Sequence, residues 1–377
     1  MRRAVEPGLR LRELRVLRLG EVRVTGTAGA TAQLSLEVGA GAVRSRELTV
    51  LDQREGGTRF LSLDVRSVLN SPASTGMGFW SINPYVGCEF GCTYCYARDT
   101  HRYAVERAEG RTGGRADGDE ALPPWLAFEK RILVKTGIAE RLALTLDPSK
   151  LGNDSLVIGT ATDPYQPAER RYRLTRSILE VLTRFRGLRI GIISKSPLVT
   201  RDIDVLQKLS ARNELTVNVS LSTLDSRTAR RLELRSPVPS ARIRALGRLS
   251  AAGVHAGLLI SPIVPGVTDD RDGLSRLMAA AKEAGARYVV GSALRLGPAA
   301  RHRFLPHLAG EFPELAERYR RHYGSREGVS REYQAALTRR LDQLQREHGF
   351  PVDEERLRRA QLEGRRQSRM IEEPALL

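Results

Sequence analysis

The chain has 377 residues, 41% of them hydrophobic and 28% charged, which excludes a disordered chain and allows one large domain or two ordinary ones. Lys and Arg outnumber Asp and Glu by 61 to 44, and the net charge of +17 predicts attraction to polyanions without identifying one. Three cysteines are too few for a disulfide-stapled secreted scaffold. No apolar run approaches the roughly 20 residues of a membrane span, so we expect a cytoplasmic protein with no membrane partner.

The excess positive charge is concentrated in one quarter of the chain. Residues 161–250 hold 18 Lys or Arg against eight Asp or Glu, a net +10 of the total +17. Three interpretations remain open: a nucleic-acid-binding face, the solvated helix surfaces of an Arg-rich chain, or a site for a small phosphate-bearing substrate. An aromatic content of 5% disfavours a stacking platform for single strands.

Residues 1–75 are expected to form a small β-rich appendage. Apolar and polar residues alternate in LRVLRLGEVRVTG and in TAQLSLEVG, and turn-forming residues separate the two stretches. This pattern is typical of half-buried strands.

From residue 76 to residue 300, short apolar runs alternate with stretches of helical spacing. The runs that predict strands are 79–87, 155–163, 188–196, 215–225, 255–266 and 287–297. The stretches that predict helices are 168–185, 199–213, 239–253 and 269–285. Strands that alternate with helices pair in parallel through right-handed crossovers. Six units suffice for a partial barrel and are too few for the closed eight-unit barrel.

The expected fold class is therefore α/β: a partial (β/α)6 barrel with a small N-terminal β segment and a helical C-terminal extension. Residues 301–377 have helical periodicity without a strand pattern, and residues 105–124 are rich in Gly and charge, which predicts a surface loop in the first unit. The predicted domains are 1–75, 76–300 and 301–377.

All three cysteines lie within eight residues, as Cys88, Cys92 and Cys95 in the spacing C-x3-C-x2-C. In a reducing compartment clustered thiolates indicate a metal, and their softness selects zinc, copper(I) or an iron-sulfur cluster. Structural zinc prefers four protein ligands, for which His101 is the nearby candidate. Three thiolates on an iron-sulfur cluster leave one iron open for chemistry, so we favour the cluster.

Two glycines, Gly87 and Gly91, flank the first two cysteines of this motif. Either their small size lets the backbone approach a cluster, or they are ordinary turn residues. The sequence leaves both explanations open.

The motif resembles the signature of the radical S-adenosylmethionine (SAM) superfamily, including the aromatic Tyr94 before the last cysteine, and the resemblance extends over residues 76–300. It implies a 4Fe-4S cluster held by Cys88, Cys92 and Cys95, with SAM on the open iron. It also implies reductive cleavage of SAM to a 5′-deoxyadenosyl radical that abstracts hydrogen from a substrate, and a reductant protein such as flavodoxin or ferredoxin.

Within that superfamily, NPYVGCEFGCTYCYAR, GTATDPYQPAE and ISKSPLVTRDIDVL look like the spore photoproduct lyase-like group. The SAM contacts that this resemblance implies are Tyr94, Thr162, Asp163, Lys195, Ser220 and Ser222. A lysine inside an apolar strand end needs a partner, and the SAM carboxylate could supply one. No catalytic hydrogen donor is assigned.

One position departs from that group, whose lyases carry a hydrogen-donating cysteine just before the hydroxyl and Asp of the second strand. Here the position is Ala161, and no fourth cysteine exists. Tyr96 and Tyr165 remain as candidate phenolic donors. The terminal step of thymine photoproduct repair is thus in doubt, and DNA repair stays only a candidate role.

The leading hypothesis is a lyase-like radical SAM enzyme whose substrate class is left open between a nucleic acid, which the positive charge of residues 161–250 weakly favours, and something smaller. The alternatives are a radical SAM enzyme acting on a small molecule or peptide, and a non-catalytic iron-sulfur or zinc protein that binds nucleic acid. Brown colour in anoxic preparations and deoxyadenosine release would separate the enzyme from the binding proteins.

Overall fold

The computed structural model describes residues 49–65, 67–100 and 122–352, all of which belong to one compact unit, Ser45–Leu377. The alternating stretches near the start of the chain, most of the Gly-rich loop, His101 and the last 25 residues lie outside the described residues. None of the described helices is long and apolar enough to cross a membrane.

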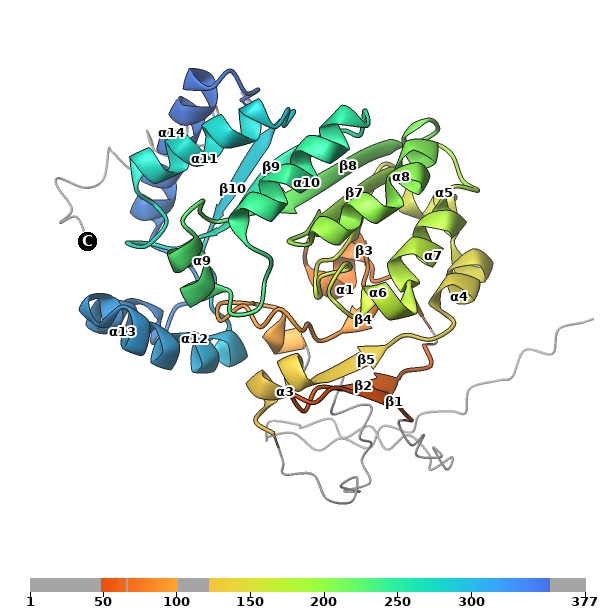
Figure 1. Ribbon diagram of the computed structural model, residues 1–377, viewed down its shortest axis with the longest axis horizontal. Helices are drawn as coiled ribbons and strands as arrows, with labels where there is room; N and C mark the ends of the chain where they lie inside the picture. The colour runs from red at the N-terminus through yellow and green to blue at the C-terminus, as the bar shows by residue number, and fades with distance from the viewer. Residues whose placement is uncertain (1–48, 66, 101–121, 353–377) are drawn as a thin grey trace, which may run out of the picture. The chain divides into compact units, whose positions relative to one another are not determined.

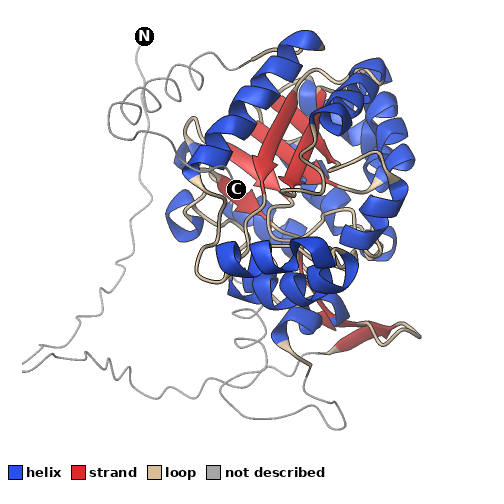
Figure 2. Cartoon of the chain, turned by 90° about the vertical axis from the view of Figure 1, so that its left-hand side faces the viewer, coloured by secondary structure: helices blue, strands red, loops and turns tan. Residues whose placement is uncertain are grey.

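A six-stranded parallel sheet forms the centre of the fold (Figures 1 and 2). Its strands are β3 (Trp80–Ile82), β6 (Ser155–Ile158), β7 (Arg189–Ser194), β8 (Glu214–Ser220), β9 (Ala256–Ile263) and β10 (Val289–Ala293). They follow the order β10-β9-β8-β7-β6-β3, every neighbouring pair is parallel, and β3 and β10 form the edges. The predicted partial barrel of six strands is confirmed.

The central strands are buried because parallel sheets are covered on both faces. In register, Ile192 of β7 lies opposite Val217 of β8, and both are fully buried. These apolar runs form the main hydrophobic core together with the inner faces of the surrounding helices. The sheet is thus a rigid platform whose carboxyl edge can position a site.

Helices cover the outer face of this sheet, as Figure 2 shows. The helices in the connections of the chain between these strands are α4 (Ile138–Thr145), α5 (Pro148–Leu151), α6 (Glu169–Tyr172), α7 (Leu174–Leu182), η1 (Pro197–Asp202), α8 (Ile203–Ser210), α9 (Ser226–Leu232), α10 (Pro239–Ala251) and α11 (Arg271–Glu283). The helices predicted from spacing are all present. The stretch 168–185 breaks in two at Arg173, whose φ is 51°, because the buried Glu169 carboxylate accepts the backbone N–H groups of Thr175 and Arg176 and so begins a new helix.

A second, four-stranded sheet was not predicted. It has the order β1-β2-β5-β4, with β1 (Val50–Gln53), β2 (Arg59–Ser62), β5 (Arg131–Val134) and β4 (Tyr85–Val86). The short helices α1 (Pro72–Thr75) and α3 (Pro124–Lys130) flank these strands in the chain. Strands of two to four residues carry too little periodicity to be recognised, and β2 pairs with β5 across some 70 residues of chain.

The C-terminal residues are helical, as expected: α12 (Pro298–Glu311), η2 (Pro313–Leu315), α13 (Ala316–Tyr323) and α14 (Arg331–Glu347). The helix α14 contacts α11 and the edge strand β10, whereas α12 lies beside α3 (Figure 1). Phe304 and Leu308 of α12 share one hydrophobic cluster with Cys88 and Cys92. The C-terminal helices therefore wall the cysteine loop, and the domain boundaries stay a prediction.

Candidate functional site

The three cysteines lie on a loop that leaves β4 at the carboxyl edge of the six-stranded sheet. Hydrogen bonds fix this loop from several sides: Cys88 N donates to Phe128 O (2.9 Å), and Thr93 donates its N–H and its hydroxyl to Leu232 O. Cys88 and Cys92 are buried and Cys95 is half-buried. The loop is thus anchored to α3 and α9, which holds the thiols in place without a disulfide.

The thiols are close enough to influence one another. Burial raises the pKa of Cys92 to about 12, and burial together with the charges of Asp163 and Cys92 raises the pKa of Cys88 well above its usual range. Thiols in such a place stay protonated until a metal displaces their protons.

The donor set at this loop suits an iron-sulfur cluster. Cys88, Cys92 and Cys95 are free thiols on one loop, and soft thiolates are the ligands that iron-sulfur clusters take. Across the described residues, no group of three or more His, Cys, Asp or Glu side chains converges on a point where a single metal ion would sit. In a 4Fe-4S cluster each cysteine binds a different iron, so the chemistry of the three donors, and not their convergence, is what fits the cluster that the motif implies.

Backbone conformation explains Gly87. Its φ is +88°, and a Cβ there would lie 2.8 Å from Phe128 O and 3.0 Å from Arg131 O. The glycine is thus required by the left-handed backbone and by the packing of the loop on α3 and β5. Gly91, with φ +62°, faces the Arg235 guanidinium in the same way.

Replacing Gly87 with alanine is expected to lower the free energy of unfolding by more than the same change at Gly78. Gly78 has φ +72° with no atom within 4 Å of its would-be Cβ, so Gly78→Ala reports the conformational cost alone, about 1–2 kcal/mol. The contact with Phe128 O should add about 1–3 kcal/mol at Gly87. Urea denaturation of both variants measures the difference, and equal losses would contradict the packing explanation.

Asp163 and Lys195, which follow β6 and β7, lie together beside the cysteines. The Asp163 carboxylate accepts from Lys195 N (2.7 Å), Ser194 Oγ (2.8 Å) and Tyr165 N (2.9 Å). Burial opposes the Lys195 charge, but the Glu233 carboxylate raises the pKa of this lysine. The structure thus brings the predicted lysine and aspartate to the cysteine loop from two neighbouring strands.

A buried ionic network surrounds Lys195. Its Nζ donates to Ser220 Oγ (3.0 Å), lies 3.9 Å from Glu233 Oε1 and sits 5.8 Å from the Tyr94 ring centre. Tyr94 Oη and the Arg242 guanidinium also donate to the Glu233 carboxylate. Tyr94, Glu233 and Arg242 are all at most 5% exposed, so the network is held away from bulk water.

The other predicted contacts occupy different positions. Thr162 Oγ1 donates to Gly87 O (2.6 Å), which makes this hydroxyl a support for the cysteine loop. Ser220 Oγ accepts from Lys195 and donates to Ser261 O (3.2 Å). Ser222 Oγ is buried without a hydrogen-bond partner among the described residues. That hydroxyl is therefore free to contact a ligand, and the SAM contacts stay a prediction.

The positions discussed as hydrogen donors are also located. Ala161 packs against the hydrophobic cluster that contains the cysteines, so the position is near the site although it carries no thiol. Tyr96 Oη donates to Thr160 O, and Tyr165 is completely buried. The donor role of either phenol stays a prediction.

Sequence reasoning missed two buried acidic groups next to the loop. Glu233 forms a backbone bridge with Cys92, and Glu129 pairs with Arg98, whose guanidinium also donates to Cys92 O (2.8 Å). Glu129 precedes Lys130 and Arg131, so its pattern does not distinguish it from a surface residue. For Glu233 a weak signal was available, since it lies between Leu232 and Leu234.

With this geometry established, comparison with known proteins identifies the class. Residues 82–278 match the Radical SAM superfamily, which is just over half of the chain, and the chain belongs to that family. Its members are enzymes that use a 4Fe-4S cluster and SAM and need an electron donor. The expected superfamily and cofactors are confirmed.

Two uncharacterised proteins have sequences similar to this chain. An uncharacterised protein of Mycobacterium tuberculosis is 30% identical over 76% of this chain and 80% of its own. An uncharacterised protein of Methanocaldococcus jannaschii is 29% identical over 50% of this chain and 61% of its own.

Solved structures share the fold. A spore photoproduct lyase mutant with bound AdoMet and dinucleoside spore photoproduct superposes with a TM-score of 0.54 at 14% identity, covering 77% of this chain and 78% of the other. Spore photoproduct lyase complexed with the dinucleoside gives 0.53 at 16% identity over the same shares. The expected likeness to this group is confirmed at the level of the fold.

Proposed function

We propose that this chain is a radical SAM enzyme whose cluster is held by Cys88, Cys92 and Cys95 and whose SAM is held by Lys195 and its neighbours. The observation that carries the proposal is the position of Lys195, beside Cys92 and inside the buried network at the carboxyl edge of the sheet. When bound and reduced, the cluster would supply one electron to cleave SAM into methionine and a 5′-deoxyadenosyl radical.

The residues of this chain would bind and orient SAM and would exclude water from the site. The Lys195 ammonium would pair with the SAM carboxylate, and the unpartnered Ser222 hydroxyl would contact the nucleoside part. Glu233 would hold the lysine through its ammonium group, and Asp163 would hold it through its backbone N–H. Phe304 and Leu308 of α12 would keep water from the cysteine loop.

Replacing Lys195 with alanine is expected to weaken SAM binding roughly 10- to 100-fold, because a charge-assisted hydrogen bond to the carboxylate is lost. The cluster should still assemble, since no cysteine changes. Calorimetric titration of cluster-loaded protein with SAM measures the effect. The matched control is Lys208→Ala, which removes an exposed lysine from α8.

Unchanged SAM affinity in Lys195→Ala would contradict the assigned role and favour an iron-sulfur protein that binds no SAM. Loss of the cluster in this variant, measured as iron and sulfide content, would show that the lysine supports the fold of the loop.

The substrate we favour is a nucleic acid. Residues 161–250 carry a net +10, and the fold is shared with a lyase bound to a dinucleoside photoproduct. Because Ala161 stands at the donor position, this chain would lack the thiol hydrogen donor implied for photoproduct lyases. A small-molecule or peptide substrate is the alternative, and anaerobic product analysis with SAM and with irradiated and unirradiated DNA and RNA separates them. Free thiols at the site would suit a reducing cytoplasm, and we expect a reductant protein such as flavodoxin or ferredoxin to supply the electron there.

A further inference from the structure

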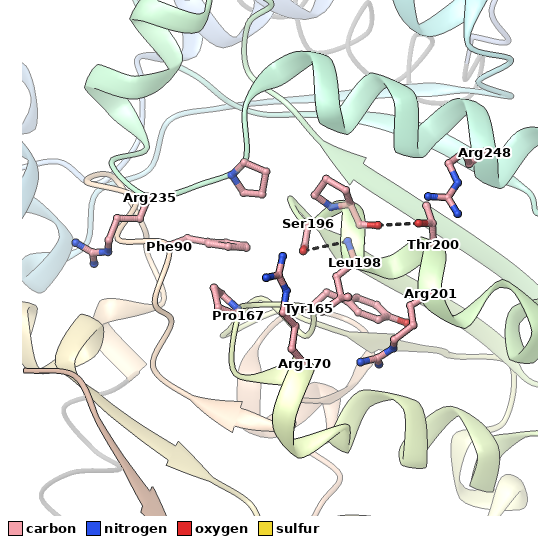
Figure 3. Close-up of a pocket in the computed structure, with 12 residues that line it drawn as sticks. Phe90, Tyr165, Pro167, Arg170, Ser196, Leu198, Thr200, Arg201, Arg235 and Arg248 are labelled. Carbon is pink, nitrogen blue, oxygen red and sulfur yellow. Dashed lines mark hydrogen bonds between the residues drawn. The ribbon is translucent and has the colours of Figure 1, made fainter. Parts of the chain in front are cut away.

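A cavity of about 560 Å³ lies directly behind the cysteine loop (Figure 3). Phe90, which stands between Cys88 and Cys92, forms one wall, and Ser196, the residue after Lys195, forms another. The cavity thus shares its walls with the loops of the proposed active site.

Arginine dominates the charge of this cavity. Four of its twelve lining residues are Arg170, Arg201, Arg235 and Arg248, and none of the twelve is acidic. All four arginines come from the segment 161–250, whose net charge is +10. The tertiary structure therefore gathers part of the excess positive charge in this one cavity.

Two of these arginines already have acidic partners. Arg201 pairs with Asp202 and Glu169, both completely buried. Arg235 donates to Glu89 O (2.7 Å) and pairs with Glu129, a carboxylate that it shares with Arg98 and Arg303. In Figure 3 the Arg235 guanidinium turns away from Phe90, so these two residues build the wall.

The other two arginines are not neutralised. Arg170 of α6 and Arg248 of α10 are exposed, and their side chains have no hydrogen bond or ion pair within the part of the chain that the structure describes. Figure 3 shows Arg170 extending toward the middle of the cavity and Arg248 lying near Thr200. Two unpaired guanidinium groups in one cavity without a carboxylate are stabilised when an anion enters.

We propose that this cavity binds a phosphate group, held by Arg170 and Arg248. Guanidinium groups match phosphate oxygens bidentately, and the Ser196 hydroxyl, which accepts from Leu198 N, keeps its own hydrogen for donation. Because both arginines reach solvent, the phosphate can belong to a continuous backbone, so we assign it to a nucleic acid. This inference deepens the proposed function and rests on it for the identity of the substrate.

The test uses the full chain with its cluster and measures equilibrium binding without turnover. The probes are a fluorescent single-stranded oligonucleotide, the same sequence as a duplex, a nucleoside monophosphate and inorganic phosphate. Arg170→Ala/Arg248→Ala is compared with Arg212→Ala/Arg244→Ala, which removes the same charge from exposed arginines outside the cavity.

For the cavity variant we expect oligonucleotide affinity to fall roughly 10- to 100-fold, and the slope of log affinity against log salt to decrease by about 1–2. The control variant should change affinity by less than about twofold. An equal loss in both variants would overturn the site, because the attraction would then be general. Absence of binding by any phosphate probe would overturn it as well.

The probes also distinguish the source of the phosphate. A mononucleotide that binds wild type and loses affinity in the cavity variant supports a phosphate site for free nucleotides, whereas an effect confined to oligonucleotides supports the nucleic-acid assignment. SAM cleavage is assayed separately on wild type, so failure of the cavity proposal is distinct from failure of the proposed enzyme.

Discussion

Cys92→Ala is expected to abolish both cluster assembly and release of 5′-deoxyadenosine, to the background of the assay. Two remaining thiolates cannot hold the cluster that three ligate, and Cys92 is the cysteine nearest to the Glu233 network. Iron and sulfide content after anaerobic reconstitution, followed by deoxyadenosine release with dithionite and SAM, measures the two losses.

The control for Cys92 is Ser236→Ala. The Ser236 hydroxyl lies 3.4 Å from Cys92 Sγ and is buried, so its removal disturbs the same place without removing a ligand. This variant should retain its iron. Deoxyadenosine release that persists in Cys92→Ala would refute the assigned site.

Glu233→Ala should lower the free energy of unfolding by about 3–5 kcal/mol, because it leaves a buried guanidinium without its carboxylate. Arg242 is 1% exposed, and its remaining hydrogen bonds to Ser220 O (3.1 Å) and Pro237 O (2.9 Å) do not balance its charge. Burial opposes ionisation of Glu233, yet Arg242 and Lys195 hold its pKa below the usual range, so the carboxylate that is removed is charged.

Urea denaturation of wild type and variant at equal cluster content measures this loss. Glu214→Ala is the matched control: it removes a carboxylate paired with Arg189 (2.9 Å) on the surface and should cost about 0–1 kcal/mol. Similar losses in both variants would show that Glu233 is not energetically coupled to Arg242. Glu233→Gln should lose less than Glu233→Ala, since its amide still accepts hydrogen bonds.

The ionic network also explains why Lys195 tolerates burial beside three thiols. Without SAM, the Lys195 ammonium has Ser220 and Glu233 as partners. When SAM binds, the ammonium would exchange part of this interaction for the carboxylate of SAM. In the proposed site Glu233 would therefore act through Lys195 and Tyr94, as a positioning residue rather than a catalytic one.

The features that were predictable from sequence depend on local spacing. Three cysteines within eight residues require no tertiary information, and an apolar run such as 188–196 indicates a buried strand on its own. The count of six such runs was sufficient for the partial barrel, because parallel strands with helical crossovers close in few ways. Lys195 was recognisable because a charge at the end of an apolar strand needs a partner.

The second sheet and the surroundings of the cysteine loop were not predictable in this way. Strands β4 and β5 are too short to have a period, and α12 reaches the loop only because the chain returns to it some 200 residues later. The hydrogen bond from the Thr162 hydroxyl to Gly87 O was not predictable either, because it depends on how close the two loops lie in the fold.

By itself the sequence determined the cysteine motif, the six-unit alternation and the amount of positive charge, because each is a property of neighbouring residues. Only the tertiary structure decided that Glu233 and Arg242 meet beside Cys92, and that Arg170 and Arg248 share one cavity while Arg201 and Arg235 have acidic partners. Such pairings depend on which loops the sheet brings to its carboxyl edge. Burial then makes every charge without a partner costly in folding free energy.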